Sequence, residues 1–345
     1  MFFSSKTPNG SLSQDIQQCL ADFFTLPPEK VASWYMLSAK TLNIALPFAA
    51  QTQHQLLKDI LAVKLSLHNS RVKDIHISTN IASAPTAIAS RPRIKNIIVI
   101  ASGKGGVGKS TTSVNLAFAL LAEGAKVGIL DADIYGPSIP MMLGNVDAKP
   151  SSEDQKQVDP IMAHGVVASS IGYFVPAENA TVWRGPMASK ALSQLLNETN
   201  WPELDYLIVD MPPGTGDIQL TLAQQIPVSG AIIVTTPQDL ALADATKGIV
   251  MFNKVNVPIL GIVENMSYHI CSQCGHHEAI FAEHGGEKLA IQFKVPLLAQ
   301  LPLNIDIRVH ADGGIPLQIN QPSHPLTLAY QELAREVSKG LYLKS

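Results

Sequence analysis

Residues 103–111 read Gly103-Lys104-Gly105-Gly106-Val107-Gly108-Lys109-Ser110-Thr111. An apolar run at residues 97–100 precedes this stretch and predicts a buried parallel strand, and residues 113–121 predict a helix. Strand, glycine loop and helix in this order fit the pattern G-x-x-x-x-G-K-[ST], whose backbone N–H groups surround phosphate oxygens at a helix N-terminus. In that pattern Lys109 reaches the β- and γ-phosphates and the Ser110 hydroxyl binds Mg²⁺. The stretch predicts a nucleotide site, and a glycine-rich turn without a ligand is the alternative.

A second lysine, Lys104, follows the first glycine of this loop. The string GKGGVGKST resembles the deviant Walker A group, which includes the MinD and ParA partition ATPases, nitrogenase iron protein and the iron–sulfur carrier ATPases. In that group the extra lysine reaches across a dimer interface to the partner's nucleotide. The resemblance therefore implies a homodimer in which Lys104 is a catalytic residue, and a solvated loop lysine is the alternative.

Composition and charge argue against several classes of protein. The chain has 345 residues, 46% of them apolar, and a net charge of −3 with a pI of about 6.4, so no basic field indicates nucleic acid or an anionic membrane. No apolar run approaches the roughly 18 residues of a membrane span, and the N-terminus lacks the pattern of a signal peptide. Three cysteines argue against a disulfide framework. We expect a soluble cytoplasmic protein with no nucleic-acid or membrane partner.

Residues 1–80 predict a small α+β domain ahead of the nucleotide domain. The expected elements are a helix at 12–24, strands at 33–37 and 41–46, a helix at 54–67 and a strand at 72–77. Cys19 lies on the first helix and is expected to be a structural thiol. Residues 81–93, rich in Ala, Ser, Thr and Pro, predict a linker. The element order resembles the accessory domain often found ahead of iron–sulfur carrier ATPases.

Residues 94–345 alternate between strands and helices, which predicts an α/β domain with a doubly wound, mostly parallel sheet. Ligands bind such sheets outside the carboxyl ends of the strands. Strands are expected at 96–101, 126–130, 166–170, 206–210, 230–235, 259–264 and 296–301, and helices at 110–122, 189–199, 240–255, 287–293 and 325–343.

Polar residues follow three of the expected strands. Asp131 and Asp133 end the second strand, and in deviant Walker A ATPases the second such Asp orients the attacking water, which implies a catalytic Asp133. Asp210 ends an apolar strand in a Walker B pattern and is expected to hold the Mg²⁺ shell. Asn265 matches a residue that holds adenine in relatives. Turn formation or helix capping is the alternative for Asp131, Asp133 and Asn265. For Asp217, which precedes an expected helix, capping is at least as good an interpretation as a catalytic role.

A loop beyond the sixth strand carries Cys271 and Cys274 in a CxxC spacing. Three interpretations are open: an iron–sulfur or other soft-metal site, a zinc half-site with His276 or His277, and a redox dithiol. A four-thiolate cluster needs four ligands, and this loop offers two. Two copies of the loop across a two-fold axis would supply four, and the lysine signature independently implies such a dimer.

Several motifs in order resemble the Mrp/ApbC-type iron–sulfur cluster carrier ATPases, over roughly three quarters of the chain: GKGGVGKST, DADIYGPS, VWRGPM, DMPPGTGD, TTPQ, ENMS and CxxCGH. The resemblance implies an ATPase that binds ATP, Mg²⁺ and a labile [4Fe–4S] cluster across a homodimer. Its implied partners are cluster assembly scaffolds and the apo iron–sulfur proteins that receive the cluster. The N-terminal domain lacks the family's usual acidic-Pro signature, and neither it nor Arg184 receives a role.

Two rival functions remain open on the sequence alone. A MinD/ParA-like positioning or regulatory ATPase would carry a structural zinc at the CxxC, but the mixed charges of the C-terminal helix do not form a basic membrane face. An electron-transfer ATPase like nitrogenase iron protein would also bridge a cluster, but that family takes its cysteines from two separated loops.

Overall fold

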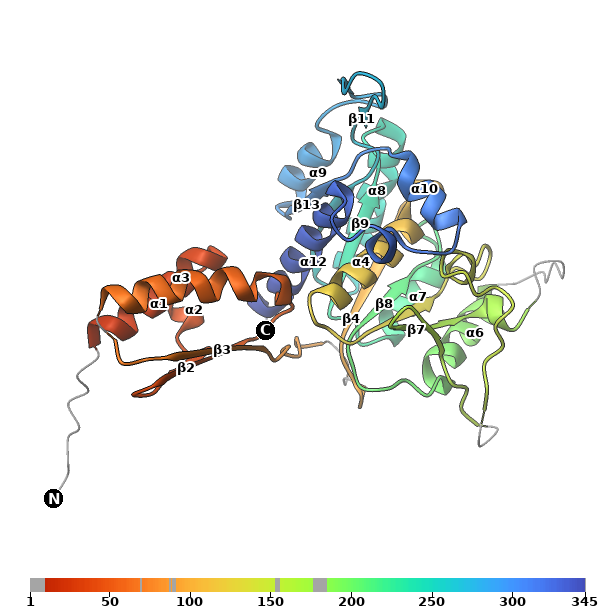
Figure 1. The fold of residues 1–345 in the computed structure, drawn as a ribbon. Coiled ribbons are helices and arrows are strands. Elements are labelled where there is room, and N and C mark those ends of the chain that lie inside the picture. The colour runs from red at the N-terminus through yellow and green to blue at the C-terminus, as the bar shows by residue number, and fades with distance from the viewer. Residues whose placement is uncertain are drawn as a thin grey trace. The chain divides into compact units, whose positions relative to one another are not determined.

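The computed structural model describes residues 10–68, 70–86, 88, 91–152, 156–175 and 185–344. The chain divides into two compact units, residues 1–82 and 83–345, each with its own sheet (Figure 1). No helix among the described residues is long and apolar enough to cross a membrane.

The small unit is a three-stranded sheet with helices. The second strand pairs antiparallel with the first and parallel with the third. An edge-to-face cluster of Phe24, Trp34 and Phe48 lies in its core, and Cys19 is buried there, where burial raises the pKa of its thiol. The elements are α1 (Gly10–Phe24), α2 (Pro28–Val31), β1 (Tyr35–Leu37), β2 (Thr41–Leu46), a 3-10 turn (Gln51–Gln53), α3 (His54–Leu67) and β3 (Asp74–Thr79).

The large unit contains an eight-stranded sheet in the order β13-β10-β9-β4-β8-β5-β7-β6. All strand pairs are parallel except β6 with β7, so the predicted doubly wound, mostly parallel fold is confirmed, with a short antiparallel strand added at one edge. The strands are β4 (Ile94–Ala101), β5 (Val127–Asp131), β6 (Ile161–Ala163), β7 (Val166–Ser170), β8 (Leu204–Asp210), β9 (Gly230–Thr235), β10 (Ile259–Glu264) and β13 (Leu297–Gln300).

Helices cover both faces of this sheet, which is why β4 is apolar along its whole length. Ile97 and Val99 belong to a core shared with α6, α7, α8 and α9, and the alternate residue Ile98 is directed to the opposite face. The helices are α4 (Lys109–Ala122), α5 (Ile139–Met142), a 3-10 turn (Ile171–Tyr173), α6 (Gly185–Glu198), α7 (Asp217–Gln225), α8 (Asp239–Lys254), α9 (Gly285–Phe293), α10 (Ile305–Asp312), α11 (Leu317–Asn320) and α12 (Pro325–Leu343).

A small hairpin interrupts the alternation after β10. It consists of β11 (His269–Ile270) and β12 (His277–Glu278), and it stands out beyond α9 and α10 at one end of the large unit (Figure 1). The CxxC motif forms the turn of this hairpin, at the carboxyl-end side of the sheet on which ligands bind.

Candidate functional site

The glycine loop joins β4 to the N-terminus of α4, as the sequence predicts. Gly108 has φ +89° and precedes the first turn of α4, and a Cβ there would lie 2.0 Å from the Asn265 side-chain nitrogen. A Cβ at Gly103 would lie 2.2 Å from the Asp244 carbonyl carbon on α8. Both positions therefore require glycine, one for backbone conformation and one for close approach.

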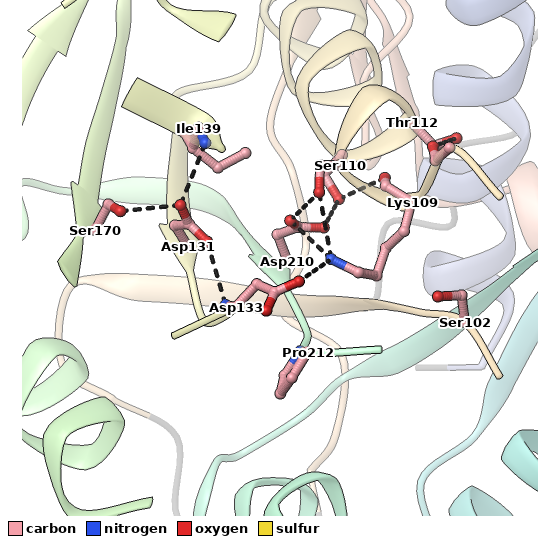
Figure 2. Close-up of polar contacts among 12 residues, drawn as sticks. Ser102, Lys109, Ser110, Thr112, Asp131, Asp133, Ile139, Ser170, Asp210 and Pro212 are labelled. Atoms are coloured by element: carbon pink, nitrogen blue, oxygen red, sulfur yellow. Dashed lines mark hydrogen bonds and ion pairs between the residues drawn. The ribbon is translucent and has the colours of Figure 1, made fainter. Parts of the chain in front are cut away.

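Lys109 and Asp210 form the centre of the site (Figure 2). The Lys109 Nζ lies 2.9 Å from Asp210 Oδ2, and both side chains are almost fully buried. The Ser110 hydroxyl donates to the same carboxylate oxygen at 2.6 Å, and Ser113 donates to the other oxygen at 2.7 Å. The end of β8 and the first turn of α4 thus share one buried carboxylate.

The hydroxyl of Ser110 and the carboxylate of Asp210 fit a Mg²⁺ ion. Oxygen donors of this kind are the ligands that Mg²⁺ prefers, and a ligand set of one or two protein oxygens plus phosphates is usual. Lys109 now neutralises Asp210, and a bound triphosphate would compete for the same ammonium group. The Lys109 ammonium group can therefore pair either with the Asp210 carboxylate or with a phosphate of the bound nucleotide.

Asp133 lies on the other side of Lys109. Its Oδ2 is 3.6 Å from the Lys109 Nζ, and burial raises its pKa, with the lysine acting in the opposite direction. Asp133 lines the cavity that opens at the glycine loop, and its carboxylate can accept a hydrogen bond from a water molecule there.

Asp131 is fully buried behind Asp133 and does not reach the cavity. Its Oδ2 accepts hydrogen bonds from the Ser170 hydroxyl at 2.9 Å and the Ile139 N–H at 3.2 Å, and its Oδ1 accepts from the Asp133 N–H at 3.2 Å (Figure 2). Burial, reinforced by the charge of Asp210, raises the pKa of Asp131 to about 7. The turn-forming alternative describes Asp131 well, because this carboxylate holds the backbone that positions Asp133.

A cavity of about 480 Å³ opens at the glycine loop. Asn265 and Met266 from the end of β10 line it, together with Leu303 and Asn304 beyond β13 and one side of α10. The Asn265 amide nitrogen donates to the Val107 carbonyl at 2.9 Å, so this side chain braces the glycine loop directly. Its contact with adenine stays a prediction.

Lys104 is turned toward the loop before α8. Its Nζ lies 3.5 Å from the Gln238 side-chain oxygen, and the Thr236 hydroxyl donates to the same oxygen at 3.3 Å. The lysine is half-buried and lies outside the set of residues that line the cavity. Its predicted reach into a partner's nucleotide stays a prediction.

The cysteine hairpin has a tightly hydrogen-bonded turn. The Cys271 N–H donates to the His276 carbonyl at 2.9 Å, the Gly275 N–H donates to the Cys271 carbonyl at 2.8 Å, and the rings of Tyr268 and His277 stack at 5.5 Å. Backbone N–H groups of Gln273 and Cys274 lower the pKa of the Cys271 thiol. Cys271 is partly exposed and Cys274 exposed, so two thiols are presented outward.

No group of three or more Cys, His, Asp or Glu side chains able to hold a metal occurs among the described residues of one chain. The predicted motif residue Arg184 lies outside the described residues.

Comparison with known proteins agrees with this geometry. The sequence model of the ParA family described as "NUBPL iron-transfer P-loop NTPase" matches residues 93–338. The chain belongs to this family. It is 56% identical over 305 residues to the "Iron-sulfur cluster carrier protein" of Salmonella typhimurium, covering 87% of this chain and 82% of that protein. It is 48% identical over 250 residues to the mouse "Iron-sulfur cluster transfer protein NUBPL", covering 72% and 78%.

Solved structures of P-loop NTPases share the fold of the large unit. A nucleotide-binding protein of Archaeoglobus fulgidus in complex with ADP has a TM-score of 0.59 at 36% identity, covering 67% of this chain and 90% of that one. The cell division ATPase MinD of Pyrococcus furiosus has a TM-score of 0.53 at 25% identity, covering 71% and 98%. The predicted resemblance to the deviant Walker A group and its iron–sulfur branch is confirmed.

Some residues of this P-loop NTPase site are absent from the sequence-based prediction. Ser113 follows Ser110 by one helical turn, so its side chain reaches the same carboxylate, a spacing visible in the sequence. The sequence around Leu303 and Asn304 indicates this part of the site more weakly. Asn304 caps α10 by accepting a hydrogen bond from the Asp306 N–H at 2.7 Å, and an Asn at this position is a recognisable sign of a helix start.

Proposed function

We propose that this protein binds and hydrolyses ATP and carries a labile [4Fe–4S] cluster, held between two copies of the chain, to apo iron–sulfur proteins. The observation that carries this proposal is the outward presentation of Cys271 and Cys274 on a hairpin beside the nucleotide cavity. The names of the relatives from Salmonella typhimurium and mouse support it. We expect it to act in the cytoplasm, where thiols stay reduced.

The cluster, as cargo, requires a second copy of the chain. A [4Fe–4S] cluster takes four cysteine thiolates, and one hairpin offers two. Cys19 is buried in the core of the small unit and is not available to a cluster bound at the hairpin. A two-fold axis beside the hairpin would bring together the required four thiolates from identical loops.

In the proposed hydrolysis, glycine-loop N–H groups and Lys109 bind the β- and γ-phosphates. Mg²⁺, when bound at Ser110 and Asp210, would neutralise charge on the phosphates. Asp133 orients a water molecule whose oxygen attacks the γ-phosphorus, the bond to the β-phosphate oxygen breaks, and ADP and phosphate leave. Lys104 of the partner chain would contribute positive charge at the same phosphates.

The test is the metal and sulfide content of anaerobically reconstituted protein, with its molecular mass. The wild-type chain should hold about four iron and four sulfide per two chains, and the Cys271→Ser/Cys274→Ser variant should hold neither. Cys19→Ser is the matched control and should keep the cluster. Stoichiometric zinc without sulfide would reject the carrier function in favour of a MinD/ParA-like regulatory ATPase with a structural zinc.

A further inference from the structure

One buried carboxyl group begins the segment that runs from the nucleotide cavity to the cysteine hairpin. Glu264 ends β10, the next residue, Asn265, braces the glycine loop, and the cysteine hairpin follows. Glu264 is 1% exposed, and neither the nucleotide chemistry nor the cysteines uses it. No ion pair joins it to a Lys, Arg or His among the described residues. A buried carboxyl group without a cation nearby needs another source of stabilisation.

Hydrogen-bond donors from three segments supply that stabilisation. The Ser267 hydroxyl donates to Glu264 Oε1 at 2.8 Å and the Gln300 amide donates to the same oxygen at 3.0 Å. The Gly286 N–H, in the first turn of α9, donates to Oε2. His284 supplies no side-chain cap to α9, so Glu264 caps this helix from outside and meets the positive end of its dipole.

The contact with Gly286 closes a loop. The chain leaves the sheet at Glu264, passes through Asn265 and the cysteine hairpin, and returns at Gly286 against the same carboxylate. A Cβ on Gly286 would lie 2.9 Å from Glu264 Oε2, so the approach leaves no room for a side chain. Both ends of the cysteine-bearing segment are therefore held by one side chain.

The segment after β13 connects this closure to the nucleotide cavity. The Leu301 N–H donates to the Glu264 carbonyl at 2.8 Å, and the Ser267 N–H donates back to the Leu301 carbonyl at 2.9 Å. The Leu303 N–H then donates to the Tyr268 carbonyl at 2.7 Å, at the foot of the hairpin. Leu303 itself lines the cavity, so a nucleotide there would touch a segment that is bridged to His269 of the hairpin.

We propose that Glu264 is a positioning residue that couples the nucleotide cavity to the cysteine hairpin. It holds the segment 264–286 closed against residues 300–303, so that a change in the cavity moves the hairpin as a unit. This inference rests on the proposed function, because it assigns ATP as the signal and the cysteine pair as the site that responds. In Glu264→Gln, the side-chain N–H₂ group would face hydrogen-bond donors instead of accepting from them. The contact would be lost either with Gly286 or with Ser267 and Gln300.

The experiment measures how fast an alkylating reagent labels Cys271 and Cys274 in the reduced, cluster-free full-length chain. Labelling is followed by peptide mass spectrometry, which separates these thiols from buried Cys19. Each protein is measured without nucleotide, with ADP and with a non-hydrolysable ATP analogue plus Mg²⁺. The variants are Glu264→Gln, the milder Ser267→Ala, and Glu287→Gln, an exposed carboxylate on the same turn of α9 that serves as the control.

Wild-type and Glu287→Gln should show labelling rates that differ by about fivefold or more between nucleotide states. Glu264→Gln should bind a fluorescent ADP with similar affinity yet reduce that difference below about twofold. Ser267→Ala should show an intermediate response, and it decides the question if Glu264→Gln does not fold. An unchanged nucleotide response in a folded variant, or no response in the wild type, overturns the coupling.

This readout needs no cluster. If the wild type shows no nucleotide-dependent labelling but has normal iron and sulfide content, the coupling alone is rejected. If the wild type shows nucleotide-dependent labelling but binds no iron and sulfide, the carrier function alone is rejected.

Discussion

Replacing Asp131 with asparagine tests the electrostatics behind the site. Asp131 is fully buried, and burial together with the nearby charge of Asp210 raises its pKa to about 7. In an unfolded chain an Asp titrates near 3.9. Between about pH 4 and pH 7 the folded protein therefore binds more protons than the unfolded chain, so its free energy of unfolding falls as the pH rises through this window.

The magnitude follows from the size of the pKa shift. One titrating group changes the free energy of unfolding by at most about 1.4 kcal/mol per pH unit, and the slope falls to half of this at pH 7, where Asp131 is half deprotonated. The change between pH 5 and pH 7 therefore amounts to about 2 kcal/mol. Asparagine carries no charge and cannot contribute this slope. The exchange also alters the hydrogen bonds to Ser170 and Ile139, but that effect is a constant offset at every pH.

The assay is urea unfolding of the nucleotide-free, cluster-free protein from pH 5 to pH 8. A Trp34→Phe background removes the tryptophan of the small unit, so the fluorescence reports on the large unit that contains Asp131. The difference in unfolding free energy, wild type minus Asp131→Asn, should fall by about 2 kcal/mol as the pH rises from 5 to 7. The exposed Asp147→Asn is the control. A difference constant within about 0.5 kcal/mol would refute the assigned burial effect.

Two further predictions concern the glycine loop and its lysine. Lys109→Ala should lower ATP hydrolysis by at least about 100-fold, and it should also lower the free energy of unfolding by about 3–5 kcal/mol because Asp210 stays buried without its cation. Adding Asp210→Asn to Lys109→Ala should recover part of that stability in urea unfolding, and no recovery would contradict the ion-pair argument. Gly108→Ala should destabilise the protein by at least about 1 kcal/mol, because φ +89° strains an L-residue and its Cβ would meet Asn265. It should also weaken binding of a fluorescent ATP analogue in titrations, whereas Gly105→Ala, where a Cβ meets nothing within 4 Å, should bind within about twofold of wild type; equal effects of the two would refute the steric reasoning.

The sequence by itself determined the features that depend on neighbouring residues. An apolar run followed by a glycine loop and a helix specifies a P-loop, because the turn, the donors and the helix dipole all lie within a few residues. Asp210 ends β8 and Asp133 follows β5 by two residues, so both carboxylates lie at the carboxyl edge of a parallel sheet, where they meet Lys109. The CxxC spacing likewise identified Cys271 and Cys274, one partly exposed and one exposed, without any knowledge of the fold.

Only the tertiary structure decided how distant segments meet. Helix α10 buries none of its residues, so its sequence shows no apolar face that would predict where it packs. It lines the cavity because the hydrogen bond from Leu303 to Tyr268 holds the preceding segment there. Glu264 looks in sequence like a polar residue at a strand end, and its role becomes visible only when Gly286 and Gln300 are placed against it. Buried carboxylates are stabilised by donors brought from far along the chain, and a local sequence pattern carries no information about which donors arrive.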